Sequence, residues 1–300
     1  MSFDEPLLEL GLTGAAYAAP ISGGAGVGFN EHELVSPASV MKIQVALTIE
    51  NLMATGKIDG ASRRSVPVGL KTPGPTGMSL MRDPVTISVR DLVVAMLTIS
   101  DNVATDELID LAGLCEINRT TSGLGLVRTE ITSDLRTMLE DMTREVGFRN
   151  FAAFIDHDPE ADGAPATDEL ARKLEGTAAL DPSHGSRTTA FEVVSLLRAI
   201  WTDHAGSPEA CKSVRETMAR QLTRNRISSG FDAPVKIAAK SGALMGTVRN
   251  EAGVVTYPDD TSYAVAVFTR KVHDSGTHPA VIDQIIGKIA RQLVEELRAK

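Results

Sequence analysis

The hydrophobic pattern of this 300-residue chain predicts strands at both ends, whereas the middle follows a mostly helical period. Near the N-terminus, residues 15–21 and 25–29 predict two short strands joined by a glycine-containing turn at residues 22–24. Near the C-terminus, the segments VKIAAKSG, TVRNEAGVVTY and TSYAVAVFTR predict three further strands, followed by an amphipathic helix that reaches Leu297. Strands that bracket a helical middle predict one sheet assembled from both ends of the chain.

The middle of the chain, from about residue 61 to 231, predicts an α-helical lobe. Two pairs of residues have the spacing of helix N-terminal capping boxes, Ser88 with Asp91 and Thr189 with Glu192. The sheet lobe would then comprise residues of about 1–60 and 232–300. We expect a single domain of the α/β (α+β) class, with a cleft between the two lobes.

The stretch SPASVMKIQVALTIENLMATG, residues 36–56, predicts a helix that is apolar on almost every side, with Ser36 as N-cap and Pro37 as first helical residue. Its one lysine, Lys42, follows Ser39 by three positions and so projects from the same face. A lysine removed from water loses basicity and can accept the proton of a nearby hydroxyl, which makes the two residues a plausible base and nucleophile. The same spacing is also typical of a lysine that reaches water beside an ordinary serine.

Two further clusters carry polar side chains at the ends of predicted elements. Ser100, Asp101 and Asn102 lie between two predicted helices, where they suit a helix cap or a hydroxyl and a carboxamide aimed into the cleft. The tripeptide from Lys240 to Gly242 ends a predicted strand. There a glycine would let a substrate backbone approach and the lysine would supply a positive charge, although an exposed strand-end turn is the alternative.

Composition restricts the partners of the chain. A formal net charge of −9 argues against binding to nucleic acid or to an anionic membrane, so we expect a small-molecule partner. If Met1 is the natural start, the absence of a signal-peptide pattern predicts a cytoplasmic protein. Cys115 and Cys211 show no metal-ligand spacing, so neither a metal nor another cofactor is expected, and the sequence does not indicate an oligomeric state.

Taken in order, the three clusters resemble the motifs of the penicillin-recognising serine enzymes, most closely the class A β-lactamases. They read Ser39-Val-Met-Lys42, then Ser100-Asp-Asn102, then Lys240-Ser-Gly242. The resemblance extends over nearly the whole chain. It implies a β-lactamase/transpeptidase-like fold, in which an antiparallel sheet is built from N- and C-terminal strands and an all-α lobe lies beside it.

The resemblance also implies a role for each residue of the first two motifs. Ser39 resembles the nucleophile, and Lys42 resembles the base or proton relay. Ser100 would pass a proton to the leaving nitrogen, and Asn102 would bind the substrate amide.

The third motif is similar to the family's site for the substrate carboxylate. Lys240 and Ser241 would hold that carboxylate, while the backbone N–H groups of Ser39 and Ala243 would form an oxyanion hole. Arg249 falls where some members of the family place a carboxylate-binding arginine. An exposed arginine on a strand is the alternative.

One departure from the family pattern bears on the second half of the reaction. Class A β-lactamases carry a Glu-x-x-Leu-Asn motif whose glutamate activates the water that hydrolyses the acyl-enzyme, and no segment here matches it. The residues from about 133 to 187 resemble an inserted helical segment instead. Glu130 and Asp134 are the nearest candidates for a replacement base, although carboxylates near a helix start need no catalytic explanation.

Three classes of function therefore stay open. The first is a serine hydrolase that acts through a Ser39 acyl-enzyme on a β-lactam or related cyclic amide, or else a cytoplasmic esterase, amidase or acyltransferase in small-molecule metabolism. The second is a covalent penicillin-binding protein with slow deacylation. The third is a binding module that has the fold and no turnover.

Overall fold

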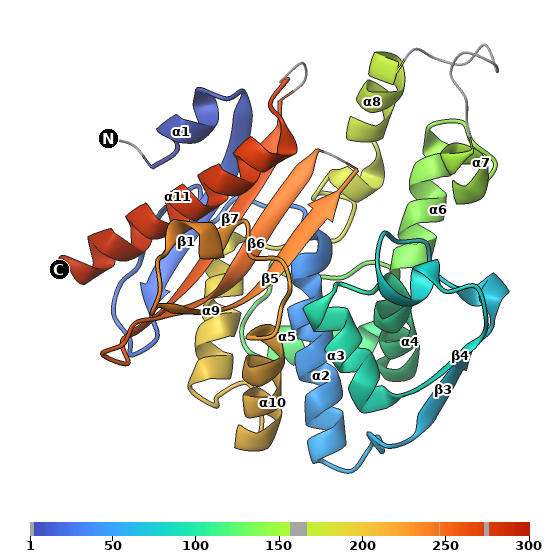
Figure 1. The fold of residues 1–300 in the computed structure, drawn as a ribbon, viewed down its shortest axis with the longest axis horizontal. Helices are drawn as coiled ribbons and strands as arrows, with labels where there is room; N and C mark the ends of the chain where they lie inside the picture. The colour runs from blue at the N-terminus through green and yellow to red at the C-terminus, as the bar shows by residue number, and fades with distance from the viewer. Residues whose placement is uncertain (1–2, 157–166, 246, 273–275) are drawn as a thin grey trace.

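The central feature of the fold is a five-stranded antiparallel sheet with the strand order β2-β1-β7-β6-β5. The computed structural model describes residues 3–156, 167–245, 247–272 and 276–300. The strands are β1 (Leu12–Pro20), β2 (Val27–Phe29), β5 (Lys236–Leu244), β6 (Val248–Thr256) and β7 (Ser262–Lys271). The sheet predicted from the two ends of the chain is thus confirmed, and Figure 1 shows the N-terminal strands lying beside the C-terminal ones.

The middle strands of the sheet are buried on both faces. Helix α11 (Pro279–Arg298) covers one face and α9 (Ala190–Trp201) covers the other (Figure 1). Strand β7 accordingly has an almost continuous run of buried residues. A strand covered on both faces needs apolar side chains at successive positions, which explains why its sequence, SYAVAVF, alternates only weakly.

Most of the remaining helices form the lobe beside the sheet. They are α3 (Val89–Thr98), α4 (Asn102–Ala112), α5 (Leu114–Gly123), α6 (Leu135–Glu145), α7 (Phe151–Ile155), α8 (Thr167–Glu175) and α10 (Pro208–Met218). Both predicted caps are present, since Ser88 Oγ accepts from the backbone N–H of Asp91 and Thr189 Oγ1 from that of Glu192. The lobe is not entirely helical, because β3 (Arg63–Val66) and β4 (Val85–Ser88) form a small sheet in it.

The segment predicted as an insertion holds α6, α7, α8 and a short 3₁₀ helix, η4 (Ala178–Leu180). Residues 157–166 of that segment lie outside the described part of the structure. The short elements elsewhere are α1 (Glu5–Leu8), η2 (Val68–Leu70), η3 (Gly77–Leu80) and η5 (Ile227–Gly230). Within the described residues, no helix has the length and apolar character needed to cross a membrane.

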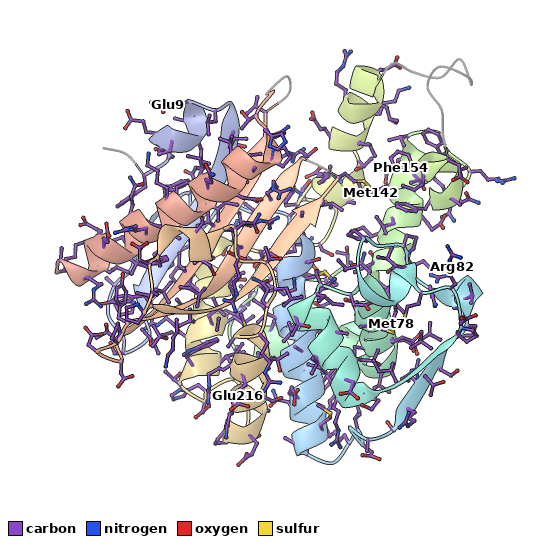
Figure 2. The ribbon with its side chains drawn as sticks, in the orientation of Figure 1. Glu9, Met78, Arg82, Met142, Phe154 and Glu216 are labelled. Carbon is purple, nitrogen blue, oxygen red and sulfur yellow. The ribbon has the colours of Figure 1, made fainter. Side chains whose placement is uncertain are left out.

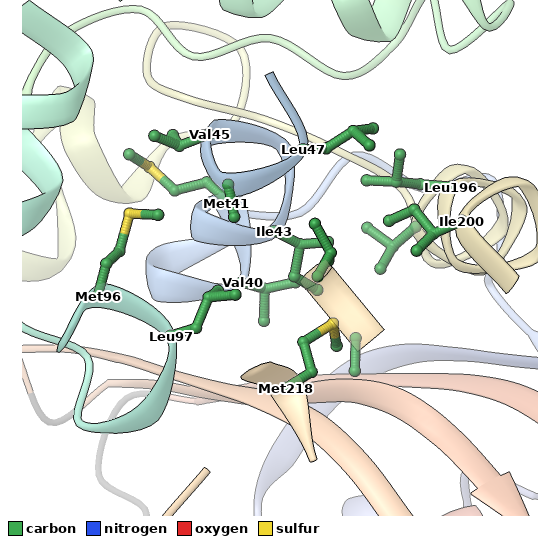
Figure 3. Packing of buried hydrophobic residues seen from close by; sticks show 14 of the residues in the cluster. Val40, Met41, Ile43, Val45, Leu47, Met96, Leu97, Leu196, Ile200 and Met218 are labelled. Atoms are coloured by element: carbon green, nitrogen blue, oxygen red, sulfur yellow. The ribbon is translucent and has the colours of Figure 1, made fainter. Parts of the chain in front are cut away.

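Helix α2 (Lys42–Ala54) runs through the centre of the molecule. Its first eight residues are all buried, from Lys42 to Ile49. Figure 3 shows why, since Ile43, Val45 and Leu47 project from different sides of the helix and meet side chains of α3, α9 and α10. The apolar pattern around all sides of the predicted helix therefore reflects complete enclosure rather than an amphipathic surface.

The start of this helix differs from the prediction that Pro37 would be its first residue. A 3₁₀ turn, η1 (Ala38–Met41), comes first, and α2 begins only at Lys42. Ala38 has a positive φ of 45°, and the Ser36 carbonyl accepts from Asn250 Nδ2 at 2.9 Å rather than from a helical N–H group. A tertiary contact with β6 thus holds the chain out of the helix at this point.

Asn250 offers a test of that contact, because its fully buried side chain joins β6 and β7 to the segment before η1. Its Nδ2 donates to the Ser36 carbonyl, and its Oδ1 accepts from the backbone N–H of Thr269 at 3.1 Å. Asn250→Ala should lower the free energy of unfolding by about 2–3 kcal/mol, since buried backbone groups lose their partners. Chemical denaturation measures this loss.

The matched control is Asn51→Ala, which removes one hydrogen bond from Asn51 to the Ala205 carbonyl at the far end of α2. We expect a smaller loss there, of about 1 kcal/mol. Equal losses in the two variants would show that Asn250 does not anchor the segment before η1.

Candidate active site

A cavity of about 390 Å³ opens where η1, the end of β5, the start of α4 and the helices α6 and α7 meet. This volume suits a small organic molecule. The residues singled out in the sequence that line it are Ser39, Ser100, Asn102, Ser241, Gly242 and Ala243. The structure therefore brings the three motifs together, although 57 residues lie between the first and the second and 137 between the second and the third.

Gly242 allows β5 to lie directly against η1. A Cβ atom added to it would lie 3.0 Å from the Pro37 carbonyl oxygen and 3.0 Å from the Ser39 backbone nitrogen. Such distances are tighter than ordinary packing permits, so any other residue would push the strand away from Ser39. The glycine thus makes room for the protein's own backbone, whereas the sequence suggested that it makes room for a substrate.

Lys42 lies beneath the cavity and is fully buried. Its Nζ donates to the Ser100 carbonyl oxygen at 2.7 Å, to Asn102 Oδ1 at 2.8 Å and to Ser100 Oγ at 3.2 Å. This burial excludes the alternative of a lysine that reaches water. Burial lowers the pKa of Lys42 from 10.5 to about 7, although the negative charges of Asp101 and Asp106 act in the opposite direction.

The Ser100–Asn102 turn is both a helix cap and a source of polar side chains that line the cavity. Ser100 has a positive φ of 61°, and this turn of the backbone directs both its carbonyl and its hydroxyl to Lys42. Asp101 caps α4 by accepting from the backbone N–H of Ala104 at 3.0 Å. Asn102 also donates to the Pro73 carbonyl at 2.8 Å. Capping by the middle residue therefore positions the two residues beside it.

Lys240 is also fully buried, which excludes an exposed strand-end lysine. Its Nζ donates to the Ser241 carbonyl at 2.7 Å, and the side chain lies behind the lining of the cavity rather than in it. Burial holds the pKa of Lys240 well below its usual value, and the charge of Lys42 lowers it further, while Glu251 opposes both effects. Of this motif, only Ser241 and Gly242 line the cavity.

Arg249 does not line the cavity, and Asp283 of α11 holds its guanidinium. Nε and Nη2 donate to the two carboxylate oxygens of Asp283 at 2.8 and 2.7 Å. A different arginine, Arg226, lines the cavity, and the sequence analysis missed it. Its Nε donates to Asp283 at 2.8 Å and its Nη1 to the Gly242 and Asn250 carbonyls at 2.7 and 2.6 Å. No local pattern distinguishes it from its neighbours Arg220 and Arg224.

Glu130 and Asp134 lie outside the cavity. Glu130 forms an ion pair with Arg187, and the backbones of the two residues exchange hydrogen bonds of 2.9 Å. Asp134 is the N-cap of α6 and accepts from the backbone N–H of Thr137 at 2.7 Å. Among the described residues, no aspartate or glutamate lines the cavity.

Apolar side chains of α6 and α7 form the wall on that side. They are Leu135, Met138, Leu139 and Phe151. Asp106 of α4 fixes the start of α6, because its carboxylate accepts from the backbone N–H groups of Leu135 at 2.8 Å and Arg136 at 2.9 Å. Among the described side chains, there is no group of three or more histidine, cysteine, aspartate or glutamate residues that could hold a metal ion.

Comparison with known proteins finds similarity over nearly the whole chain. Over 98% of its length, the chain is 27% identical to the β-lactamase regulatory protein BlaB of Streptomyces cacaoi, of which it covers 96%. Among solved structures, a β-lactamase from Sphaerobacter thermophilus superposes with a TM-score of 0.75 at 21% identity, covering 100% of this chain and 98% of that one. The structure of PBP-A gives 0.75 at 18% identity, covering 99% and 96%.

These solved structures have the same fold, with the antiparallel sheet and helical lobe described above. The model of the β-lactamase enzyme family matches residues 9–297. The chain therefore belongs to the β-lactamase enzyme family.

Proposed function

We propose that this protein is a serine hydrolase that forms a Ser39 acyl-enzyme with a β-lactam or a related cyclic amide and releases the acyl group slowly. The observation that carries the proposal is the buried Lys42 ammonium, which contacts Ser100 and Asn102 directly beneath the cavity that Ser39 lines. A lysine with a pKa near 7 is partly neutral at physiological pH and can accept a proton.

Acylation would proceed by transfer of the Ser39 hydroxyl proton to neutral Lys42, directly or through the Ser100 hydroxyl. The Ser39 oxygen then bonds to the carbonyl carbon, and the carbon–nitrogen bond breaks. Ser100 gives its proton to the leaving nitrogen and recovers one from Lys42, so that protons balance. The backbone N–H groups of Ser39 and Ala243 would stabilise the oxyanion, since Gly242 holds the two segments against each other.

The substrate carboxylate would bind at Arg226 and Ser241. Both residues line the cavity, and the Arg226 guanidinium stays charged because arginine holds its proton under all ordinary conditions. We assign the carboxylate to Arg226 rather than to Arg249, because both guanidinium groups are paired with Asp283 but only Arg226 lines the cavity.

Slow release of the acyl group follows from the lining of the cavity. Attack of water on the acyl-enzyme needs a general base, which typically contributes about 10²- to 10⁴-fold in rate. None of the described aspartates and glutamates lines the cavity to supply one. The same observation favours a second candidate, a covalent sensor that stays acylated. The relative named as a β-lactamase regulatory protein is consistent with that alternative.

The proposal predicts biphasic kinetics with a chromogenic β-lactam. We expect a burst of one product per enzyme, followed by turnover about 10²- to 10⁴-fold slower, because deacylation lacks its base. Stopped-flow absorbance measures both phases, and intact-mass spectrometry detects the adduct. Ser39→Ala should abolish the burst and the adduct together.

Glu130→Gln and Asp134→Asn serve as controls, because both carboxylates lie outside the cavity. Both variants should retain the burst and the slow phase. Fast turnover without a burst, or loss of the slow phase in either control, would contradict the proposed deacylation defect.

A second prediction separates the chemistry of Lys42 from its structural cost. Lys42→Met should reduce the acylation rate about 10²-fold or more, since the base is lost. Its free energy of unfolding should equal or exceed that of the unmodified protein, because an ammonium group no longer has to be buried. In the unmodified protein, the acylation rate should rise as the pH increases through about 7.

The burial of Lys42 also predicts the direction in which the free energy of unfolding changes with pH. Lys42 has a pKa of about 7 when folded and 10.5 as its ordinary value, so the unfolded chain binds the extra proton between these values. The free energy of unfolding of the unmodified protein should therefore increase relative to that of Lys42→Met as the pH rises from 7 toward 10.5. The exposed Lys57→Met should show no such trend. A Lys42→Met protein that acylates normally, or is less stable throughout, would assign the lysine a structural role.

A further inference from the structure

The cavity has an apolar part next to Ser39 that the proposed acylation chemistry does not use. Six residues line this part, which we call the acyl chamber; they come from α6, from α7, from the end of β5 and from the residue after it: Leu135, Met138, Leu139, Phe151, Leu244 and Met245. None of these side chains can donate a hydrogen bond, and none carries an oxygen that could accept one.

The acyl chamber lies on the far side of Ser39 from the polar end of the cavity. Along β5, Ser241 comes first, Gly242 packs against the Ser39 backbone, and Leu244 follows about 7 Å further on, at roughly 3.3 Å per residue. Ala38, the residue before Ser39, packs against the same apolar cluster as Leu244 and Met138. The acyl chamber therefore begins beside the nucleophile, whereas Ser241 and Arg226 occupy the other direction.

The chamber wall belongs to a packed core and is not a loose surface loop. Met138, Leu244 and Met245 pack with the buried Met142, Leu174 and Leu180, and Figure 2 labels Met142 and Phe154 where α6, α7 and α8 come together. The rings of Phe151 and Phe154 lie with their centroids 6.0 Å apart. The start of α6 is held by hydrogen bonds to Asp106 and Asp134.

We propose that the acyl chamber binds an apolar acyl group, so that the preferred substrate carries an aliphatic or aromatic acyl moiety in its ester or amide bond. This inference rests on the proposed Ser39 acyl-enzyme. A polar acyl side chain would lose its hydrogen bonds with water there and find no side-chain partner among these six residues, whereas an apolar one gains from leaving water.

The chemistry of the step is unchanged by this assignment. With an ester, the Ser39 oxygen bonds to the acyl carbon, the carbon–oxygen bond to the alcohol breaks, and the alcohol leaves with the proton that Lys42 relays. The side chains that line the acyl chamber include no general base for water. Slow hydrolysis and a preference for apolar acyl groups thus follow from the same lining.

A homologous series of 4-nitrophenyl esters, from acetate to octanoate, tests the inference on the unmodified protein. The second-order rate constant for the nitrophenol burst is divided by the rate constant for hydroxide-catalysed hydrolysis of each ester. Full burial of one methylene corresponds to roughly a fourfold increase. We expect a rise of about tenfold or more from acetate to hexanoate, allowing for partial burial. A flat or falling series would overturn the assignment.

Variants of α6 locate the effect. Met138→Gln introduces a polar side chain of similar length into the acyl chamber and should reduce the octanoate-to-acetate ratio several-fold, whereas Met138→Leu should keep it. Thr137→Gln is the matched control, because Thr137 is exposed on the same helix and does not line the cavity. It should leave the whole series unchanged, and an equal reduction in Thr137→Gln would also overturn the assignment.

Failure of this inference is distinct from failure of the proposed function. A Ser39 burst whose rate does not depend on acyl length would contradict the proposed role of the acyl chamber and leave the proposed acyl-enzyme intact. Absence of any burst or Ser39 adduct, with every ester and every β-lactam, would remove both.

Discussion

An ammonium group enclosed without access to water is the constraint on which the site depends. Burying a charge is costly unless acceptors surround it, and Lys42 finds them in the Ser100 carbonyl and in Asn102. These acceptors exist only if the chain turns sharply at Ser100, where φ is positive, and then starts α4 under the cap of Asp101. The position of α4 against α2 is therefore coupled to the chemistry of one lysine.

Lys240 is a second fully buried lysine near the site, so its charge depends mainly on how far burial lowers its pKa. Burial lowers the pKa of Lys240 and the charge of Lys42 lowers it further, while the buried Glu251 of β6 opposes both effects. Glu251 is itself held by Gln221 and by the backbone N–H of Ile227, and burial raises its pKa. Arg226, whose guanidinium keeps its charge, is then the most dependable cation for attracting an anionic substrate.

The sequence predicted those features that depend on neighbouring residues. Short apolar segments bounded by turn residues identified the strands of the large sheet, and the caps at Ser88 and Thr189 depend only on a residue three positions away. The three motifs could be found because each is a short local pattern and because the three follow one another in the order typical of the family. Their convergence on one cavity could be expected only through that resemblance.

The features that escaped prediction depend on contacts between distant segments. The start of α2 is displaced because Asn250, more than 200 residues away, takes the Ser36 carbonyl. Asp283 of α11 binds the guanidinium groups of both Arg226 and Arg249, and only Arg226 also lines the cavity, which no local sequence pattern shows. The apolar wall depends on how α6 is oriented, and the amphipathic pattern of α6 does not state which neighbour its apolar face meets.

One face of α4 connects the two halves of the site. Asn102 and Asp106 are four residues apart and so lie on the same side of this helix. Asn102 accepts from Lys42, while Asp106 accepts from the first N–H groups of α6 and also favours the charged form of Lys42. A change in the position of α6 would therefore move a carboxylate that influences the lysine beneath Ser39. Two residues of α4 therefore position both parts of the site. Asp106 holds the start of α6, whose side chains would receive the acyl group, and Asn102 holds Lys42, the base that would form the acyl-enzyme.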